Sequence, residues 1–130
     1  MKYAEIVEEI TDQNYFRFNN RLYKPPKGLV MGLPIPPILA ETFMNDFENK
    51  MFKGNRFGSM IKHWTRFVDD ILVVWPGTDR QVHLFLKETN AMHKDIKFTV
   101  EKRNKPINYL DLTLTVHSKG IDCKIYGKSA

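Results

Sequence analysis

Two apolar runs, separated only by Asp69 and Asp70, constrain the fold of this chain more than any other feature. The first run covers residues 60–68, and the second, residues 71–75, is continuously apolar. A connection this short joins two strands only as an antiparallel hairpin. Runs of such composition are typical of strands that are buried on both faces of a sheet. Two negative side chains beside a buried sheet cost several kcal/mol unless a cation compensates their charge.

Two interpretations of Asp69 and Asp70 follow from the residues alone. In the first, the pair binds a divalent metal. Mg²⁺ prefers oxygen ligands, and one or two carboxylates together with substrate phosphates are enough to hold it. Two such ions, about 4 Å apart, serve phosphoryl transfer. In the second interpretation the pair forms a solvated turn, because Asp is common in turns.

The hydrophobic pattern predicts three helices around this hairpin. The first covers residues 2–13, where apolar residues recur at helical spacing. The second begins near Pro37, and residues 49–59 after it are predicted to form a loop. The third runs from a cap at Thr78 or Asp79 to about residue 93. The apolar face of the second helix is expected to comprise Leu39, Phe43, Phe47 and Met51. That of the third is expected to comprise Val82, Phe85, Leu86 and Thr89.

The remaining segments are predicted as strands and turns. Asn19 and Asn20 separate two short aromatic runs and suit a two-residue hairpin turn, because Asn tolerates positive φ. Residues 25–37 hold most of the prolines and are expected to form no regular element. Strands are predicted at residues 96–102, 107–116 and 121–126. Because the connections are short, the order of elements predicts an α+β fold with mostly antiparallel pairing.

Composition narrows the class of protein. Basic residues outnumber acidic ones by 20 to 15, and the net charge of +5 suits a polyanionic partner, although many unrelated proteins share it. The single cysteine, Cys123, forms no internal disulfide, so we expect a reducing, intracellular compartment. No apolar run approaches the length of a membrane span, so no membrane partner is expected. The histidines lack metal-like spacing.

Four stretches in order resemble reverse transcriptases. Residues 67–70, Phe-Val-Asp-Asp, resemble the aromatic-x-Asp-Asp box of that family. Upstream, residues 27–40 (KGLVMGLPIPPILA) resemble its Gly-x-x-x-Gly-Ser-Pro-x-Ser-Pro motif. Downstream, residues 93–101 (HKDIKFTVE) and 107–114 (INYLDLTL) resemble two further blocks. These motifs are most similar in sequence to those of Penelope-like retroelement reverse transcriptases, and the resemblance covers about residues 14–126.

This resemblance implies a partial right-hand polymerase palm: a ferredoxin-like antiparallel sheet with helices on one face and the first strand missing. It implies one domain, in which residues 1–27 lead into a palm core at 28–130. The implied partners are an RNA template, a DNA primer and a deoxynucleoside triphosphate, and the implied cofactor is Mg²⁺ or Mn²⁺. The implied site residues are Asp69 and Asp70 as catalytic metal ligands, and Gly28, Gly32, Pro34 and Lys97 as contacts to substrate or template.

The chain also departs from the family pattern. No motif with a further catalytic Asp precedes Gly28, and the fingers, the first palm strand and the thumb are expected but absent. Pro36 stands where the family has Ser, which removes an N–H and a hydroxyl from the loop that would face the template. A catalytically inactive palm remnant that binds nucleic acid or protein is therefore an alternative, and an unrelated α+β interaction module is a third. A retroelement origin would imply action in the nucleus.

Overall fold

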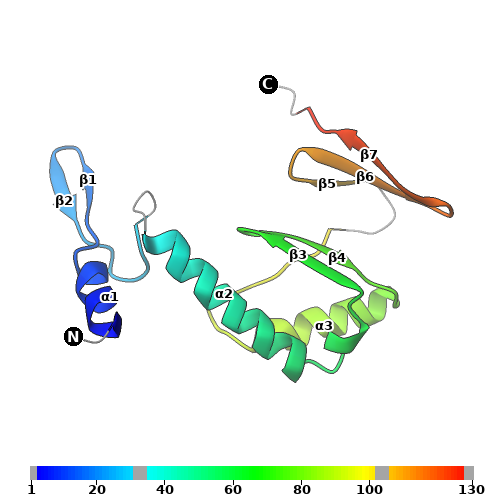
Figure 1. Ribbon diagram of the computed structural model, residues 1–130, viewed down its shortest axis with the longest axis horizontal. Helices are drawn as coiled ribbons and strands as arrows, with labels where there is room; N and C mark the ends of the chain where they lie inside the picture. The colour runs from blue at the N-terminus through cyan, green and yellow to red at the C-terminus, as the bar shows by residue number, and fades with distance from the viewer. Residues whose placement is uncertain (1–2, 31–34, 102–105, 128–130) are drawn as a thin grey trace. The chain divides into compact units, whose positions relative to one another are not determined.

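The computed structural model describes residues 3–30, 35–101 and 106–127 of the chain (Figure 1). The chain divides into two compact units, Met1–Asp46 and Phe47–Ala130. Among the described residues, no helix is both long and apolar enough to cross a membrane.

The first unit begins with a helix and a hairpin, as predicted. Helix α1 spans Tyr3–Asp12, and strands β1 (Phe16–Phe18) and β2 (Arg21–Tyr23) pair antiparallel. The two turn residues have positive φ values, 49° at Asn19 and 59° at Asn20. Positive φ at both central residues is what a primed hairpin turn requires, so the asparagine pair forms the turn for the predicted reason.

Helix α2, which spans Ile35–Gly54, is longer than the sequence pattern predicted. It begins slightly early, and the predicted loop is wrong for residues 49–54, which are helical. Met51 continues the four-residue apolar repeat and is fully buried, at 0% exposure. The ring of Phe52 packs edge-on against Trp64, with centroids 5.4 Å apart. This packing extends the helix through a stretch that is polar in sequence, because burial of an apolar face outweighs weak local propensity.

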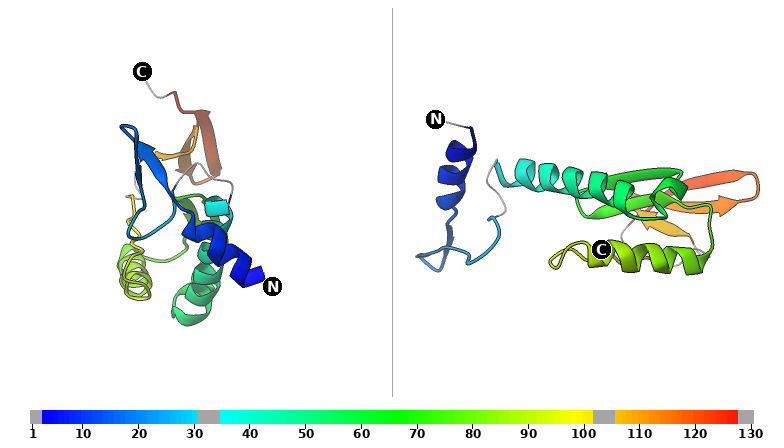
Figure 2. Two further views of the ribbon diagram at one scale, coloured as in Figure 1. Left: turned by 90° about the vertical axis from the view of Figure 1, so that its left-hand side faces the viewer. Right: turned by 90° about the horizontal axis from the view of Figure 1, so that it is seen from below.

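In the second unit, β3 (His63–Phe67) and β4 (Asp70–Val74) form the predicted antiparallel hairpin. The C-terminal turns of α2 and helix α3 (Asp79–Ala91) lie on the same side of it (Figures 1 and 2). The indole of Trp64 on β3 contacts a ring from each helix, Phe52 on α2 and Phe85 on α3. Both helices therefore cover one face of this hairpin.

The prediction that the hairpin is buried on both faces is wrong. Phe67, next to the turn, is 60% exposed, and Val68, in the turn, is 70% exposed. Exposure alternates along β3. Trp64 and Trp75, farther from the tip, are half-buried. The alternation means that the helices cover one face only, so residues on the opposite face and at the tip stay in contact with solvent.

The core of the second unit centres on α3. Thr78, one of the two caps that the sequence allowed, caps this helix, and it forms a capping box with Gln81. Phe85 and Thr89, on the predicted apolar face, are buried. Asn55, at the end of α2, donates from Nδ2 to the Phe85 carbonyl oxygen and to the Thr89 hydroxyl oxygen, each at 3.2 Å. A buried amide thus ties α2 to α3.

The last three strands form one antiparallel sheet in the order β5–β6–β7. They are β5 (Ile107–Tyr109), β6 (Leu112–His117) and β7 (Gly120–Ile125). The prediction of one strand over residues 107–116 is wrong, because Leu110 and Asp111 form a turn there. Leu110 has a φ of 54°, which a continuous strand does not permit.

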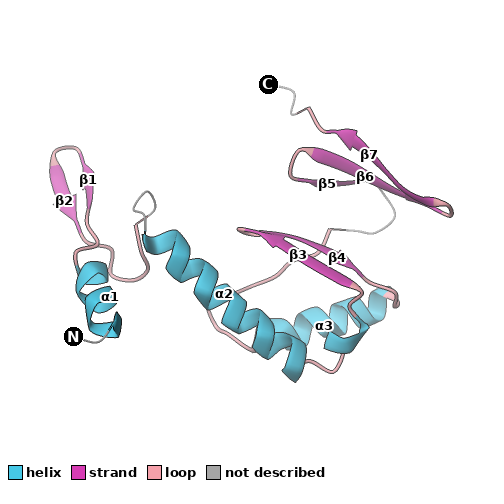
Figure 3. Ribbon diagram, in the orientation of Figure 1, coloured by secondary structure: helices cyan, strands magenta, loops and turns pink. Residues whose placement is uncertain are grey.

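The predicted strand at 96–102 is absent from its described part, residues 96–101, which follow an irregular path (Figure 3). The side chain of Asn90 on α3 takes the place of a neighbouring strand. It donates to the Phe98 carbonyl oxygen at 2.9 Å and accepts from the Phe98 N–H at 2.7 Å. Because one side chain satisfies both backbone groups, this segment needs no sheet partner at Phe98.

The described residues thus form three helices and small antiparallel sheets, which confirms the α+β class and the antiparallel pairing. The specific palm architecture remains a prediction.

Candidate carboxylate site on the β3–β4 turn

Asp69 lies in the turn between β3 and β4, and Asp70 is the first residue of β4. The register pairs Phe67 with Asp70, so the two-residue turn is Val68-Asp69, one position earlier than the aspartate pair itself. Val68 has a φ of 56°. Positive φ in a β-branched residue is a rare and strained conformation, and such strain concentrates at functional sites.

A buried ion pair supports this turn. Arg66 on β3 donates from Nε to a carboxylate oxygen of Glu48 on α2 at 2.6 Å, and the two side chains are only 5% and 13% exposed. The same oxygen accepts the Trp64 indole N–H at 3.0 Å. Arg66 also donates from Nη1 to the Val68 carbonyl oxygen at 3.3 Å. Helix α2 is therefore linked through Arg66 to the strained residue beside Asp69.

No sequence motif pointed to Glu48 or Arg66. A signal was present, because Trp64 and Arg66 are two positions apart on one strand and therefore share a face. A charged residue on the same face as a buried aromatic needs a partner of opposite charge. The sequence does not show which acidic residue supplies it.

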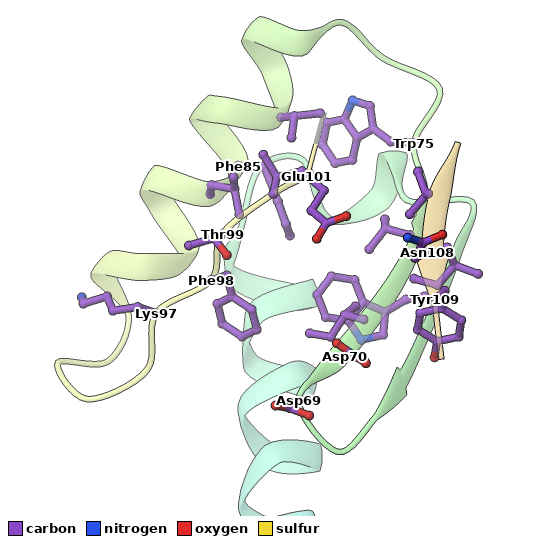
Figure 4. A pocket seen from close by; sticks show the side chains of 18 residues that line it. Asp69, Asp70, Trp75, Phe85, Lys97, Phe98, Thr99, Glu101, Asn108 and Tyr109 are labelled. Atoms are coloured by element: carbon purple, nitrogen blue, oxygen red, sulfur yellow. The ribbon is translucent and has the colours of Figure 1, made fainter. Parts of the chain in front are cut away.

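Both aspartates line a cavity of about 350 Å³ between the hairpin, α3, residues 97–101 and β5 (Figure 4). Asp69 and Asp70 lie at one end of it, and Trp75 at the other. Lys97, Glu101 and Tyr109 are also among its lining residues, and the Lys97 side chain runs away from the two aspartates. Within the described part of the chain, the buried hydroxyl of Tyr109 has no hydrogen-bond partner. A cavity with apolar walls and few polar groups is a typical small-ligand site.

Lys97, which the resemblance implies as a contact to substrate or template, lines this cavity and is exposed. Its ammonium group donates to the Asn90 carbonyl oxygen at 2.7 Å. Asn90 fixes the neighbouring Phe98 backbone, and the Phe98 ring stacks on Phe47 of α2 at 5.8 Å. The structure thus brings Lys97 into the same cavity as the two aspartates.

Gly28 belongs to the first unit, and the two aspartates belong to the second. Its φ of 80° lies in the region that favours glycine. The side chain of buried Asn14 donates to the Gly28 carbonyl oxygen at 2.9 Å and accepts from the Val30 N–H at 2.7 Å. Asn14, to which no sequence pattern pointed, therefore fixes the backbone from Gly28 to Val30. Gly32 and Pro34 lie outside the described residues.

The aspartate pair has the chemistry of a divalent cation site, because hard carboxylate oxygens are the ligands that Mg²⁺ and Mn²⁺ prefer. Both side chains are exposed, so water or phosphate oxygens can complete the coordination. In residues 3–30, 35–101 and 106–127, no group of three or more His, Cys, Asp or Glu side chains is arranged to hold a metal ion. Metal binding here would depend on the two aspartates and on oxygens from a ligand.

Comparison of the chain with protein-family models, with curated proteins and with solved structures found no match.

Proposed function

We propose that this chain is part of an RNA-directed DNA polymerase of a retroelement and contributes the palm residues for metal-dependent nucleotidyl transfer. The observation that carries the proposal is the placement of Asp69 and Asp70 at a strained hairpin turn that borders a cavity. The resemblance of four ordered sequence stretches to reverse transcriptases supports the same function.

In this proposal Asp69 and Asp70 hold Mg²⁺ or Mn²⁺ next to the phosphates of a deoxynucleoside triphosphate. Such a metal would supply positive charge beside the phosphates, which is the chemistry that nucleotidyl transfer requires. Lys97 lies along the cavity and carries a positive charge suited to a phosphate. Gly28 and the loop after it are proposed to contact the template or the nucleotide, as in the family.

A catalytically inactive palm remnant that binds nucleic acid or protein is the second candidate function. The observation that favours it is the absence, among the residues that the structure describes, of a third metal-binding side chain near the two aspartates. A remnant of this kind would keep the basic charge and the fold without transferring nucleotides.

Primer extension on a poly(rA) template with an oligo(dT) primer tests the proposal. We expect Mg²⁺- or Mn²⁺-dependent extension that falls at least about 100-fold in Asp69→Asn, because the amide cannot replace a charged metal ligand. Asp111→Asn is the matched control, since Asp111 also holds the second position of a two-residue turn after a residue with positive φ. This control should keep its activity.

Extension that is equal in Asp69→Asn and the unchanged chain would contradict the catalytic role of Asp69. If no metal supports extension while the chain still binds an RNA–DNA duplex, the polymerase proposal fails and the remnant is favoured.

A further inference from the structure

Strand β7 (Gly120–Ile125) forms an open edge of the β5–β6–β7 sheet (Figure 1). It pairs with β6 on one side, and in the described residues no strand lies on its other side. All six of its residues are exposed, and Ile121 and Ile125 are 57% and 87% exposed. The strand contains no proline, and its register with β6 is continuous. It thus lacks the proline or bulge that natural proteins use to block edge pairing.

The register divides the sheet into an apolar and a polar face. Leu112, Leu114 and Val116 on β6 lie opposite Ile125, Cys123 and Ile121 on β7. Partners in a ladder share a face, so these residues form one apolar face. The alternate positions form the polar face, where Asp122 and Lys124 lie opposite Thr115 and Thr113. The only charged side chains of β7 are therefore one acid and one base on the same face.

The same register shows which backbone groups of β7 point outward. The hairpin closes at the pair His117–Gly120 around a two-residue turn. In such hairpins the closing pair exchanges hydrogen bonds, and bonded and non-bonded pairs then alternate. Tyr126 lies an even number of positions after Gly120, so it should also bond toward β6. Its N–H does donate to the Asp111 carbonyl oxygen, at 2.7 Å, which agrees with this alternation. Ile121, Cys123 and Ile125 therefore direct their N–H and C=O groups away from β6.

We propose that β7 pairs with β7 of a second copy of this chain, antiparallel, about a two-fold axis at Cys123. In this register Asp122 of each copy lies opposite Lys124 of the other, and Ile121 lies opposite Ile125. The charges are thus self-complementary across the axis, which is what an interface between identical copies requires. The apolar face continues from one sheet into the other, and the outward backbone groups of Ile121, Cys123 and Ile125 gain partners.

Other registers do not satisfy the same conditions. An axis at Asp122 places that carboxylate opposite itself, and an axis at Lys124 does the same for the ammonium group; like charges directly opposite destabilise a sheet. An axis between two residues pairs odd-numbered positions of one β7 with even-numbered positions of the other. Outward-directed backbone groups then face inward-directed ones, and the apolar face of one sheet continues into the polar face of the other. Axes nearer the ends of β7 pair fewer residues and lose the Asp122–Lys124 match. Pairing by one six-residue strand buries a small interface, so we expect a weak dimer.

Sedimentation velocity of the 130-residue chain over a concentration series tests the proposal. We expect a concentration-dependent dimer. In the proposed register residue 122 of each copy lies opposite residue 124 of the other, so there are two such pairs. Asp122→Lys and Lys124→Asp each give both pairs like charges, so each should weaken the dimer about 10-fold. The double variant, Asp122→Lys with Lys124→Asp, restores opposite charges and should restore the dimer. Lys119→Asp is the matched control for Lys124→Asp, because it makes the same charge change in the β6–β7 turn, outside the proposed pairing.

A bis-maleimide reagent with a short spacer provides a second measurement. Cys123 is the single cysteine of the chain and is exposed, so each thiol adds to one maleimide and the reagent joins two copies only through this residue. Paired residues of this kind have Cα atoms about 5.5 Å apart, within reach of such a reagent. We expect cross-linking of the unchanged chain and of the double variant, and much less of each single variant.

Three results would overturn the proposal: a monomer at every concentration, a dimer that both single variants leave unchanged, or a double variant that stays as weak as the single ones. Far-UV circular dichroism of each variant shows whether the fold is kept.

Discussion

Single asparagine side chains organise the irregular segments of this protein. Asn14 holds the loop at Gly28, Asn55 joins the end of α2 to α3, and Asn90 holds the backbone at Phe98. An amide side chain carries both donors and an acceptor, so it can satisfy backbone N–H and C=O groups where no strand or helix does. The sequence gives no local sign of these roles, because each partner lies at least eight positions away.

The buried pair of Glu48 and Arg66 should be a large contribution to stability. Glu48→Gln removes the charge that faces a guanidinium side chain only 5% exposed. We expect the free energy of unfolding to fall by about 3 kcal/mol, because a buried charge is left without its partner. Urea denaturation followed by circular dichroism measures this change.

Glu88→Gln is the matched control for that substitution. Glu88 pairs with Arg56 at 2.5 Å, and the two side chains are 34% and 61% exposed. Exposed pairs contribute less than about 1 kcal/mol, so this variant should unfold almost as the unchanged chain does. Equal losses in the two variants would show that burial of the Glu48 pair has no energetic consequence.

Val68 should be destabilising in its present conformation. Its φ of 56° costs about 1–2 kcal/mol for a residue with a Cβ atom, whereas glycine adopts it freely. After the greater freedom of glycine in the unfolded chain is subtracted, Val68→Gly should stabilise the fold by about 0.5–1 kcal/mol. Thermal unfolding of the variant measures the gain.

Val116→Gly provides the comparison, because Val68 and Val116 are both 70% exposed. Val116 lies within β6, where glycine weakens a strand, so the same substitution there should lower stability by about 1 kcal/mol. A Val68→Gly variant that loses as much stability as Val116→Gly would show that the turn is not strained.

At the scale of elements, helices with a clear apolar face were predicted well and strands less well. The four-residue repeat predicted α2, and a cap at Thr78 or Asp79 predicted the start of α3 to within one residue. The predicted strand at 107–116 is a hairpin instead, with a turn at Leu110, whose φ is positive. No sequence signal marked this turn, because glycine, asparagine and aspartate are the usual residues at such a position and leucine is not. Helical faces depend on spacing within one segment, whereas the ends of strands depend on partners elsewhere in the chain.

The passage from α2 to β3 depends on a glycine at position 58. A Cβ atom on Gly58 would overlap the backbone carbonyl group of Phe52, which cannot move without disturbing the helix. We therefore expect Gly58→Ala to lower the free energy of unfolding by about 2 kcal/mol. Chemical denaturation measures the loss.

Gly54→Ala is the control at the end of the same helix. No atom lies within 4 Å of a Cβ placed on Gly54, and alanine favours the helix more than glycine does. This variant should be as stable as the unchanged chain or slightly more stable. If Gly58→Ala behaved in the same way, the close approach to Phe52 would not constrain the connection.

At the scale of the whole molecule, the sequence by itself determined the α+β class, the first hairpin, the Asp-Asp hairpin and the positions of the three helices. These features follow from turn chemistry and from the period of apolar residues, both of which act within a few positions along the chain. Only the tertiary structure decided that Asp69 and Lys97 border one cavity, that Glu48 pairs with Arg66, and that β7 presents an unpaired edge. These features depend on contacts between residues distant in sequence, whose partners no local pattern specifies.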